Sequence, residues 1–158
     1  VQTPVAPAQG VRLAAPTPVV IPILRAGLGM LDGMTRLLPT AEVGFLGMVR
    51  DHDTLQPTTY ADRIPGDLKG RQVFLLDPML ATGQSIVAVF NKLIAKGTPK
   101  EIHLISVIGA EEGINFIKNH FPENTHLWIA TIDATLNEKG YIVPGLGDAG
   151  DLAYGSKL

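Results

Sequence analysis

The segment DPMLATGQS, residues 77–85, places an acid before a small-residue turn that opens an apolar helical pattern. A turn from a strand into a helix leaves several backbone N–H groups at the positive end of the helix dipole, where they bind anions. Thr82 and Ser85 add hydroxyl donors, while Ala81 and Gly83 leave the backbone open to a ligand. A phosphate group is the anion that this arrangement suits.

Asp77 has the wrong charge to contact that phosphate, but a carboxylate accepts hydrogen bonds from the hydroxyl groups of a sugar. An acid beside a phosphate-binding turn therefore predicts a site for ribose 5-phosphate. A structural alternative stays open, in which Asp77 and Pro78 form a turn and Thr82 only caps the helix. The segment is not a Walker motif, because no lysine follows Gly83.

Arg25 and Arg50 each follow a short apolar run that is typical of a buried strand. A guanidinium group binds the oxygens of a diphosphate through a planar fork, so both residues are candidates for holding a diphosphate. The alternative is an ordinary surface arginine, which for Arg50 would pair with Asp51 or Asp53.

Other motifs in the sequence do not lead to a site. Gly145, Gly147 and Gly150 match the dinucleotide pattern G-x-G-x-x-G, but that pattern must open a helix within a βαβ unit, and only eight residues follow Gly150. In RAGLGMLDG the third glycine, Gly33, comes one position too late for the same pattern. Ser85 lies in GQSIV rather than in a nucleophile elbow.

Composition excludes further classes of function. With 13 basic and 15 acidic residues and no basic block, nothing indicates a nucleic-acid-binding face. The chain has no cysteine, which excludes disulfides and thiolate zinc sites and fits a cytoplasmic protein, and no apolar run is long enough to cross a membrane. The histidines show no metal-ligand spacing, and we expect structural or solvent-facing roles for all four, His52, His103, His120 and His126.

The elements that must position these residues alternate between strands and helices. Short apolar runs predict strands over 19–24, 43–49, 73–76, 101–108 and 126–131. Helical spacing predicts helices over 28–38, 86–94 and 111–120. This alternation predicts a single α/β domain over residues 1–158, with a mostly parallel sheet covered by helices on both faces. Residues 50–67 interrupt the rhythm and read as a long loop or β-arm.

Ligands of open α/β sheets bind beyond the carboxyl ends of the strands. That rule singles out the segments ILRAGLG, VRDHDT, DPMLATGQS and VPGLGDAGD.

The four segments together resemble one family. DPMLATGQS resembles the phosphoribosyl-diphosphate loop of type I phosphoribosyltransferases, in the form found in uracil phosphoribosyltransferases. PILRAGLGM, VRDHDTLQP and GYIVPGLGDAGD resemble the same family in the same order and at similar spacings, from about Thr3 to the C-terminus.

The resemblance implies transfer of the phosphoribosyl group of phosphoribosyl diphosphate to uracil, giving UMP and diphosphate. It assigns catalytic roles to Arg25, Arg50 and Asp148. The residues implied to bind phosphoribosyl diphosphate are Arg25, Ala26, Gly27, Arg50, Asp77, Pro78, Met79, Leu80, Ala81, Thr82, Gly83, Gln84, Ser85 and Asp148. Those implied to bind uracil are Tyr141, Ile142, Gly147, Asp148 and Ala149. Mg²⁺ is expected to bind through substrate and water, with no direct protein ligand.

The resemblance also implies a flexible β-arm, a homo-oligomer that is a dimer by family likeness, and GTP as an activator. Two departures from the family pattern stand out: Gln84 replaces a second glycine of the phosphate loop, and Leu152 replaces a basic residue after GDAGD. We also expect some tens of residues of the family's N-terminal region to lie outside this chain. Two alternatives remain, a nucleotide-binding regulator of the same fold and a folded fragment that binds its ligands without turnover.

Overall fold

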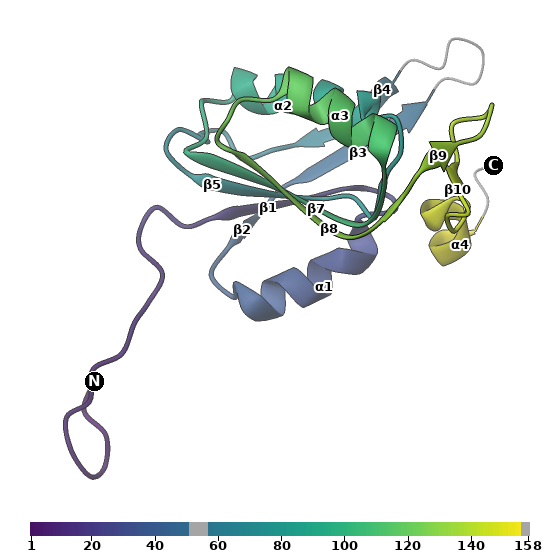
Figure 1. The fold of residues 1–158 in the computed structure, drawn as a ribbon. Coiled ribbons are helices and arrows are strands. Elements are labelled where there is room, and N and C mark those ends of the chain that lie inside the picture. The colour runs from purple at the N-terminus through teal and green to yellow at the C-terminus, as the bar shows by residue number, and fades with distance from the viewer. Residues whose placement is uncertain (51–56, 156–158) are drawn as a thin grey trace.

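In the computed structural model, which describes residues 1–50 and 57–155, a mixed β-sheet forms the centre of the molecule (Figure 1). Its strands are β1 (Val19–Leu24), β2 (Glu42–Val43), β3 (Phe45–Arg50), β4 (Pro57–Arg63), β5 (Gln72–Leu76), β6 (Met79–Leu80), β7 (Glu101–Ala110) and β8 (Thr125–Asp133). They lie in the order β4-β3-β1-β5-β7-β6, with β2 also beside β1 and β8 beside β7. All of these pairs are parallel except β3 with β4, which confirms the predicted mostly parallel sheet.

Helices cover both faces of the sheet, as predicted (Figure 1). Helix α1 (Leu28–Leu37) lies on one face, and α2 (Gln84–Ala95) and α3 (Glu111–His120) lie on the other. The main core forms on the second face, where Ile86, Val89, Leu93, Ile114 and Ile117 pack against the sheet. Helix α1 has no fully buried residue, so it covers its face less completely.

The apolar runs gave correct elements with some wrong boundaries. The single strand predicted over 43–49 is two strands, β2 and β3, separated by Gly44, whose N–H donates to Val20 O of β1 at 2.9 Å. The phosphate-loop segment 77–85 is not a turn throughout, since Met79–Leu80 form strand β6 and pair with Ile108–Gly109 of β7. This short strand draws part of the segment into the sheet.

The predicted β-arm over residues 50–67 contains strand β4. Strand β4 runs antiparallel to β3, and the register shifts between Gly47 and Met48. Lys92 of α2 lies 3.5 Å from the carboxylate of Asp62 on β4, which ties this strand to the body. Residues 51–56 lie outside the described residues, so flexibility of the arm stays a prediction.

A small C-terminal unit lies beyond the carboxyl ends of the strands (Figure 1). It consists of β9 (Thr135–Leu136) paired antiparallel with β10 (Ile142–Val143), followed by the short helix α4 (Ala149–Tyr154). Ile142 packs with Ile108 and Ala110 in a cluster of its own, which attaches the unit to β7. The sequence patterns predicted neither this hairpin nor this helix. None of the described helices has the length and apolar character of a membrane span.

Candidate functional site

The predicted site segments meet at one end of the sheet. Strand β1 ends at Leu24 and leads into Arg25, strand β5 ends at Leu76 and leads into Asp77, and β3 ends at Arg50. Because β1 lies between β3 and β5 and is parallel to both, these three ends are neighbours. The side chain of Arg50 lies outside what the structure describes, so only the backbone of that residue is placed.

The turn after β1 packs directly against the end of β5. Gly27 lies so close to the neighbouring backbone that a side-chain carbon there would collide with Leu76 O. Its N–H donates to Ile23 O at 2.8 Å, which closes the turn, and the Leu24–Arg25 peptide is cis. A residue larger than glycine would push the loop that carries Arg25 away from the end of β5, which leads into Asp77. Gly27 thus sets the spacing between the two proposed binding loops.

The phosphate-loop segment enters helix α2 through a left-handed residue. Gly83 has φ of +80° and occupies the N-cap position, a conformation that residues with side chains rarely adopt. The N-cap of α2 is thus Gly83, and Thr82 lies one residue before it. The first N–H groups of α2 point out of the helix beyond Gly83, as an anion site requires.

Helix α3 supports the phosphate loop from behind. A side-chain carbon at Gly113 would collide with Ala81 O, so the helix and the loop touch through their backbones. Sequence reasoning did not find Gly113. A signal was available, because a glycine inside a helix costs about 1 kcal/mol relative to alanine and is retained where close packing needs it.

Asp77 lies at the mouth of this loop, partly shielded from solvent. Burial raises the pKa of its carboxyl from 3.8 to about 7, and a hydrogen bond from the Met79 N–H at 3.3 Å opposes that rise. This bond to the residue two positions on is an Asx turn, so the structural alternative for Asp77 and Pro78 describes real geometry. It does not use the whole carboxylate, whose second oxygen can accept hydroxyl groups.

The glycine-rich C-terminal segment forms an ordered turn. Gly145 N–H donates to the Asp133 carboxylate at 2.9 Å, which fastens the turn to the end of β8, and the Val143–Pro144 peptide is cis. Gly147 has φ of +79°, and a side-chain carbon there would meet only Leu152 Cδ1, at 4.0 Å. Asp148 accepts a hydrogen bond from the Asp151 N–H at 2.9 Å and so caps α4.

An ion pair connects this C-terminal unit to the loop after β1. Arg25 Nη2 lies 2.6 Å from Asp151 Oδ1, and Arg25 Nη1 donates to Gly155 O at 3.1 Å. The proposed diphosphate loop and the proposed base-binding turn are therefore in contact, although they are more than 120 residues apart in the chain. No sequence pattern predicts this pair.

Comparison with known proteins identifies the family. A family model described as uracil phosphoribosyltransferase matches residues 1–156. The chain belongs to the uracil phosphoribosyltransferase family. Uracil phosphoribosyltransferases of Kineococcus radiotolerans and Streptomyces avermitilis are 57% and 58% identical to it, each over 98% of the chain. The matches span 74% and 73% of those relatives, so the relatives are longer than this chain.

Solved structures confirm the predicted type I phosphoribosyltransferase fold. A protein of Aquifex aeolicus aligns over the whole chain and 74% of its own, with a TM-score of 0.91 at 38% identity. A purine phosphoribosyltransferase of Pyrococcus horikoshii aligns over 73% of the chain and 75% of its own, with a TM-score of 0.53 at 19% identity. At that identity the second likeness shows the fold alone.

The two departures from the uracil phosphoribosyltransferase pattern lie at exposed positions. Gln84 is the first residue of α2, and its side chain is exposed. Leu152 is 72% exposed, and its Cδ1 lies 4.0 Å from where a side-chain carbon of Gly147 would be. Whether either residue changes ligand binding stays a prediction.

Two of the residues that the family resemblance assigned to ligand binding are buried in apolar clusters, and Met79 and Ala81 pack against the second of these clusters. Leu80 is 1% exposed and belongs to the main core, and Ile142 is 6% exposed and packs with Ile108. Any contact of these two residues with a ligand must come from their backbone groups. Tyr141, by contrast, is 42% exposed beside the turn.

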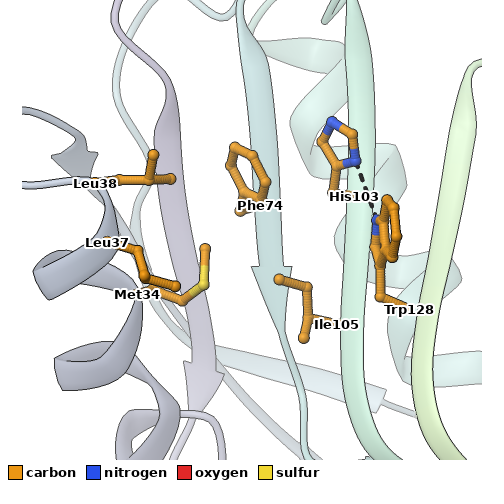
Figure 2. A pocket seen from close by; sticks show the side chains of 7 residues that line it. All are labelled: Met34, Leu37, Leu38, Phe74, His103, Ile105 and Trp128. Carbon is orange, nitrogen blue, oxygen red and sulfur yellow. Dashed lines mark hydrogen bonds between the residues drawn. The ribbon is translucent and has the colours of Figure 1, made fainter. Parts of the chain in front are cut away.

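An apolar cavity of about 360 Å³ lies away from this site, on the α1 face of the sheet (Figure 2). Phe74, His103, Ile105 and Trp128 from the sheet face Met34, Leu37 and Leu38 from α1 and the residue after it. It is apolar and offers no donors for a sugar phosphate, so we place the chemistry at the strand ends instead.

The histidines do not gather at the candidate site. The His103 ring stacks between Phe74 and His126, at 4.6 and 4.9 Å, and its Nδ1 accepts a hydrogen bond from Trp128 at 3.2 Å. Burial, and then the neighbouring His126, lower the pKa of His103. His120 Nδ1 lies 2.8 Å from Phe116 O, while His52 lies outside the described residues. These contacts agree with the structural roles expected for His103 and His120.

Proposed function

We propose that the protein transfers the 5-phosphoribosyl group of phosphoribosyl diphosphate to N1 of uracil, giving UMP and diphosphate. The observation that carries the proposal is the meeting of three segments at one end of the sheet. Asp77 stands before the anion-binding entrance of α2, Arg25 lies on the adjoining loop, and the glycine-rich turn contacts that loop through Asp151. Membership of the uracil phosphoribosyltransferase family supports the same reaction.

The sugar phosphate is proposed to bind at the phosphate loop. The 5′-phosphate accepts hydrogen bonds from the first N–H groups of α2 and from Thr82 and Ser85. The ribose hydroxyls donate to the Asp77 carboxylate, whose burial strengthens each bond to the ionised form. Backbone groups of Leu80 and Ala81 complete the loop.

The diphosphate is proposed to bind at the neighbouring turn. Arg25 and Arg50 reach its oxygens, and the N–H groups of Ala26 and Gly27 add donors. As the bond from C1′ to the diphosphate oxygen breaks, negative charge grows on the diphosphate and positive charge grows on the ribose ring. The arginines bind the diphosphate more strongly in the transition state than in the ground state, because its negative charge has grown. Loss of either arginine should therefore lower kcat.

Uracil is proposed to bind at the glycine-rich turn. Its edge presents an acceptor, a donor and an acceptor, which main-chain N–H, C=O and N–H groups complement. Residues Tyr141, Ile142, Gly147, Asp148 and Ala149 supply these groups and the walls around them, and Asp148 also faces the sugar. N1 attacks C1′ from the face opposite the diphosphate, the C1′–N1 bond forms, and the N1 proton leaves to solvent. No covalent intermediate with the protein is needed.

Magnesium belongs to this proposal as a partner of the substrate. By the family resemblance, a Mg²⁺ ion would bind through substrate oxygens and water, with no direct protein ligand. When bound, it would supply positive charge that offsets the charge on the leaving diphosphate.

Assembly and regulation are further parts of the proposal. Trp128 and Leu37 are 57% and 75% exposed on the α1 face, and apolar surface of this kind supports the proposed homo-oligomer. Activation by GTP and a cytoplasmic location rest on the family likeness. Sedimentation of the purified chain tests the homo-oligomer, and turnover measured with and without GTP tests the activation.

One assay tests the function. The protein is incubated with phosphoribosyl diphosphate, Mg²⁺ and uracil, cytosine or hypoxanthine in turn, and the nucleotide products are separated by chromatography. We expect UMP from uracil and no product from cytosine, because the cytosine amino group would face a backbone donor, a mismatch worth up to about 10⁴-fold. Product from hypoxanthine or cytosine at a comparable rate would contradict the proposal.

A further inference from the structure

The guanidinium group of Arg25 is held by the C-terminal unit. Its Nη2 lies 2.6 Å from Asp151 Oδ1, and its Nη1 donates to Gly155 O at 3.1 Å. The two side chains are 32% and 37% exposed, so solvent reaches the pair without separating it. Two bonds from different nitrogens fix both the position and the plane of the guanidinium.

Asp151 is itself fixed by the turn that carries the proposed base-binding residues. Its N–H donates to the Asp148 carboxylate at 2.9 Å, and Leu152 N–H donates to Asp148 O at 2.9 Å. One residue earlier, Gly150 packs against the Arg25 loop, where a side-chain carbon would lie 3.7 Å from Ala26 N. The start of α4 and the loop after β1 therefore form one contact, with the ion pair at its edge.

We propose that Asp151 is a positioning residue: it orients Arg25 toward the diphosphate and couples the base-binding turn to the diphosphate loop. The inference rests on the proposed function and names a residue that the family resemblance did not assign to the site. An unpaired arginine at this exposure would sample many rotamers, whereas Arg25 is held ready for a ligand. Displacement of a reacting or stabilising group by about 1 Å can cost about 100-fold in rate.

The hydrogen bonds of Arg25 leave room for a ligand. A guanidinium carries five N–H donors, and the contacts to Asp151 and Gly155 use two of them. The remaining donors can reach diphosphate oxygens while the ion pair stays in place. Asp151 therefore acts with the ligand rather than in competition with it.

The test compares Asp151→Ala with Arg25→Ala and with the double variant. Because Asp151 acts through Arg25, we expect Asp151→Ala to lower kcat by about 10- to 100-fold and to weaken inhibition by diphosphate. The affinity for ribose 5-phosphate should stay unchanged. The double variant should be no slower than Arg25→Ala alone, because the two residues act as one unit. Asp151→Glu, which keeps the charge, should recover part of the loss.

Asp32→Ala is the matched control. It breaks an arginine–aspartate pair of similar length, Arg36–Asp32 at 2.8 Å, on the exposed side of α1. We expect activity within about twofold of the unmodified protein for this variant, as for other surface substitutions. Thermal unfolding of each variant checks that the fold is kept.

Three outcomes would overturn the inference. If Asp151→Ala raises KM for uracil at unchanged kcat, Asp151 only stabilises α4. If the double variant loses the product of the two single effects, the residues act independently. If Asp151→Asn turns over faster, Asp151 competes with the diphosphate.

Calorimetry with inorganic diphosphate separates this inference from the proposed function. A protein that makes no UMP but binds diphosphate, more weakly after Asp151→Ala, would contradict the proposed function and keep the coupling. Diphosphate binding that is equal before and after Asp151→Ala would overturn the coupling, even where UMP is formed. A protein that shows neither turnover nor diphosphate binding would overturn both.

Discussion

Replacement of Asp77 by asparagine tests the phosphate-loop assignment through two independent measurements. The first is stability. Because burial raises the pKa of Asp77 from 3.8 to about 7, the folded protein holds a proton on this carboxyl that the unfolded chain has already released between about pH 4 and 7. The free energy of unfolding therefore falls as pH rises through this window.

The size of this effect follows from the two pKa values. The difference between 3.8 and about 7 corresponds to at most about 4 kcal/mol, and solvent contact of the partly buried carboxyl reduces it. Asparagine keeps the shape and the acceptor for the Met79 N–H but does not ionise. Asp77→Asn should therefore match the unmodified protein near pH 4 and become the more stable of the two at pH 8.

The second measurement is ligand binding. If the ionised carboxylate accepts the ribose hydroxyls, its loss removes charge-assisted hydrogen bonds worth about 1.5–3 kcal/mol. Affinity for ribose 5-phosphate, measured by calorimetry at pH 8, should fall by about 10- to 150-fold in Asp77→Asn. The more stable variant would thus be the weaker binder.

Asp67→Asn is the control for both measurements. Asp67 accepts a hydrogen bond from the N–H two residues on, Lys69, at 2.9 Å, in the same local geometry as Asp77 but at an exposed turn. We expect neither the pH dependence of stability nor the affinity to change in that variant. Equal affinity of Asp77→Asn and the unmodified protein would refute the ribose role, and an equal pH dependence would refute the burial argument.

The remaining predictions address other parts of the site. Arg50→Ala should lower kcat by about 100-fold with little change in ribose 5-phosphate affinity, because this arginine is proposed to bind the departing diphosphate; an equal loss of affinity would place it on the 5′-phosphate. Gln84→Gly should bind phosphate equally or more tightly, and weaker binding would reveal a contact made by the exposed side chain. Gly147→Val should abolish uracil use and spare sugar-phosphate binding, because valine is strained at φ of +79°; full activity would exclude this turn as the base site. Burial lowers the pKa of His103, so in acid the unfolded chain binds more protons on this residue than the folded protein does. The free energy of unfolding should therefore fall as pH drops through about 6.5, and it should fall less in His103→Phe. Urea unfolding at several pH values can check both expectations.

The sheet could be predicted because its central strands are buried on both faces. Residues 19–21 of VVIPIL are 0% exposed, and a strand without solvent contact must be apolar throughout. The strands β6, β9 and β10 have two residues each, which is too short for any period to appear. Their existence depends on partners that the sequence brings close only after the sheet has formed.

The site could be predicted as a set of segments but not as a set of contacts. The rule that ligands bind at the carboxyl ends of parallel strands located Arg25, Asp77 and Arg50 from their positions after apolar runs. No local pattern encodes the pair of Arg25 with Asp151, because it depends on how α4 packs against the loop after β1. The resemblance names residues that bind a ligand, but it does not say whether the backbone or the side chain makes the contact. The side chain of Leu80 is buried in the core, so only its backbone can reach a ligand.

The two halves of the candidate site are anchored differently. The proposed sugar-phosphate half follows strands whose side chains form the main core, so its geometry changes only if the sheet does. The proposed base half follows a two-stranded hairpin and is fastened by polar contacts, from Asp133 to Gly145 N–H and from Asp151 to Arg25. Segments with few buried apolar residues open at lower free energy than a core. The ion pair of Asp151 joins this segment to Arg25. Ordering of the proposed base-binding turn would therefore also orient the Arg25 guanidinium, which is proposed to bind the diphosphate.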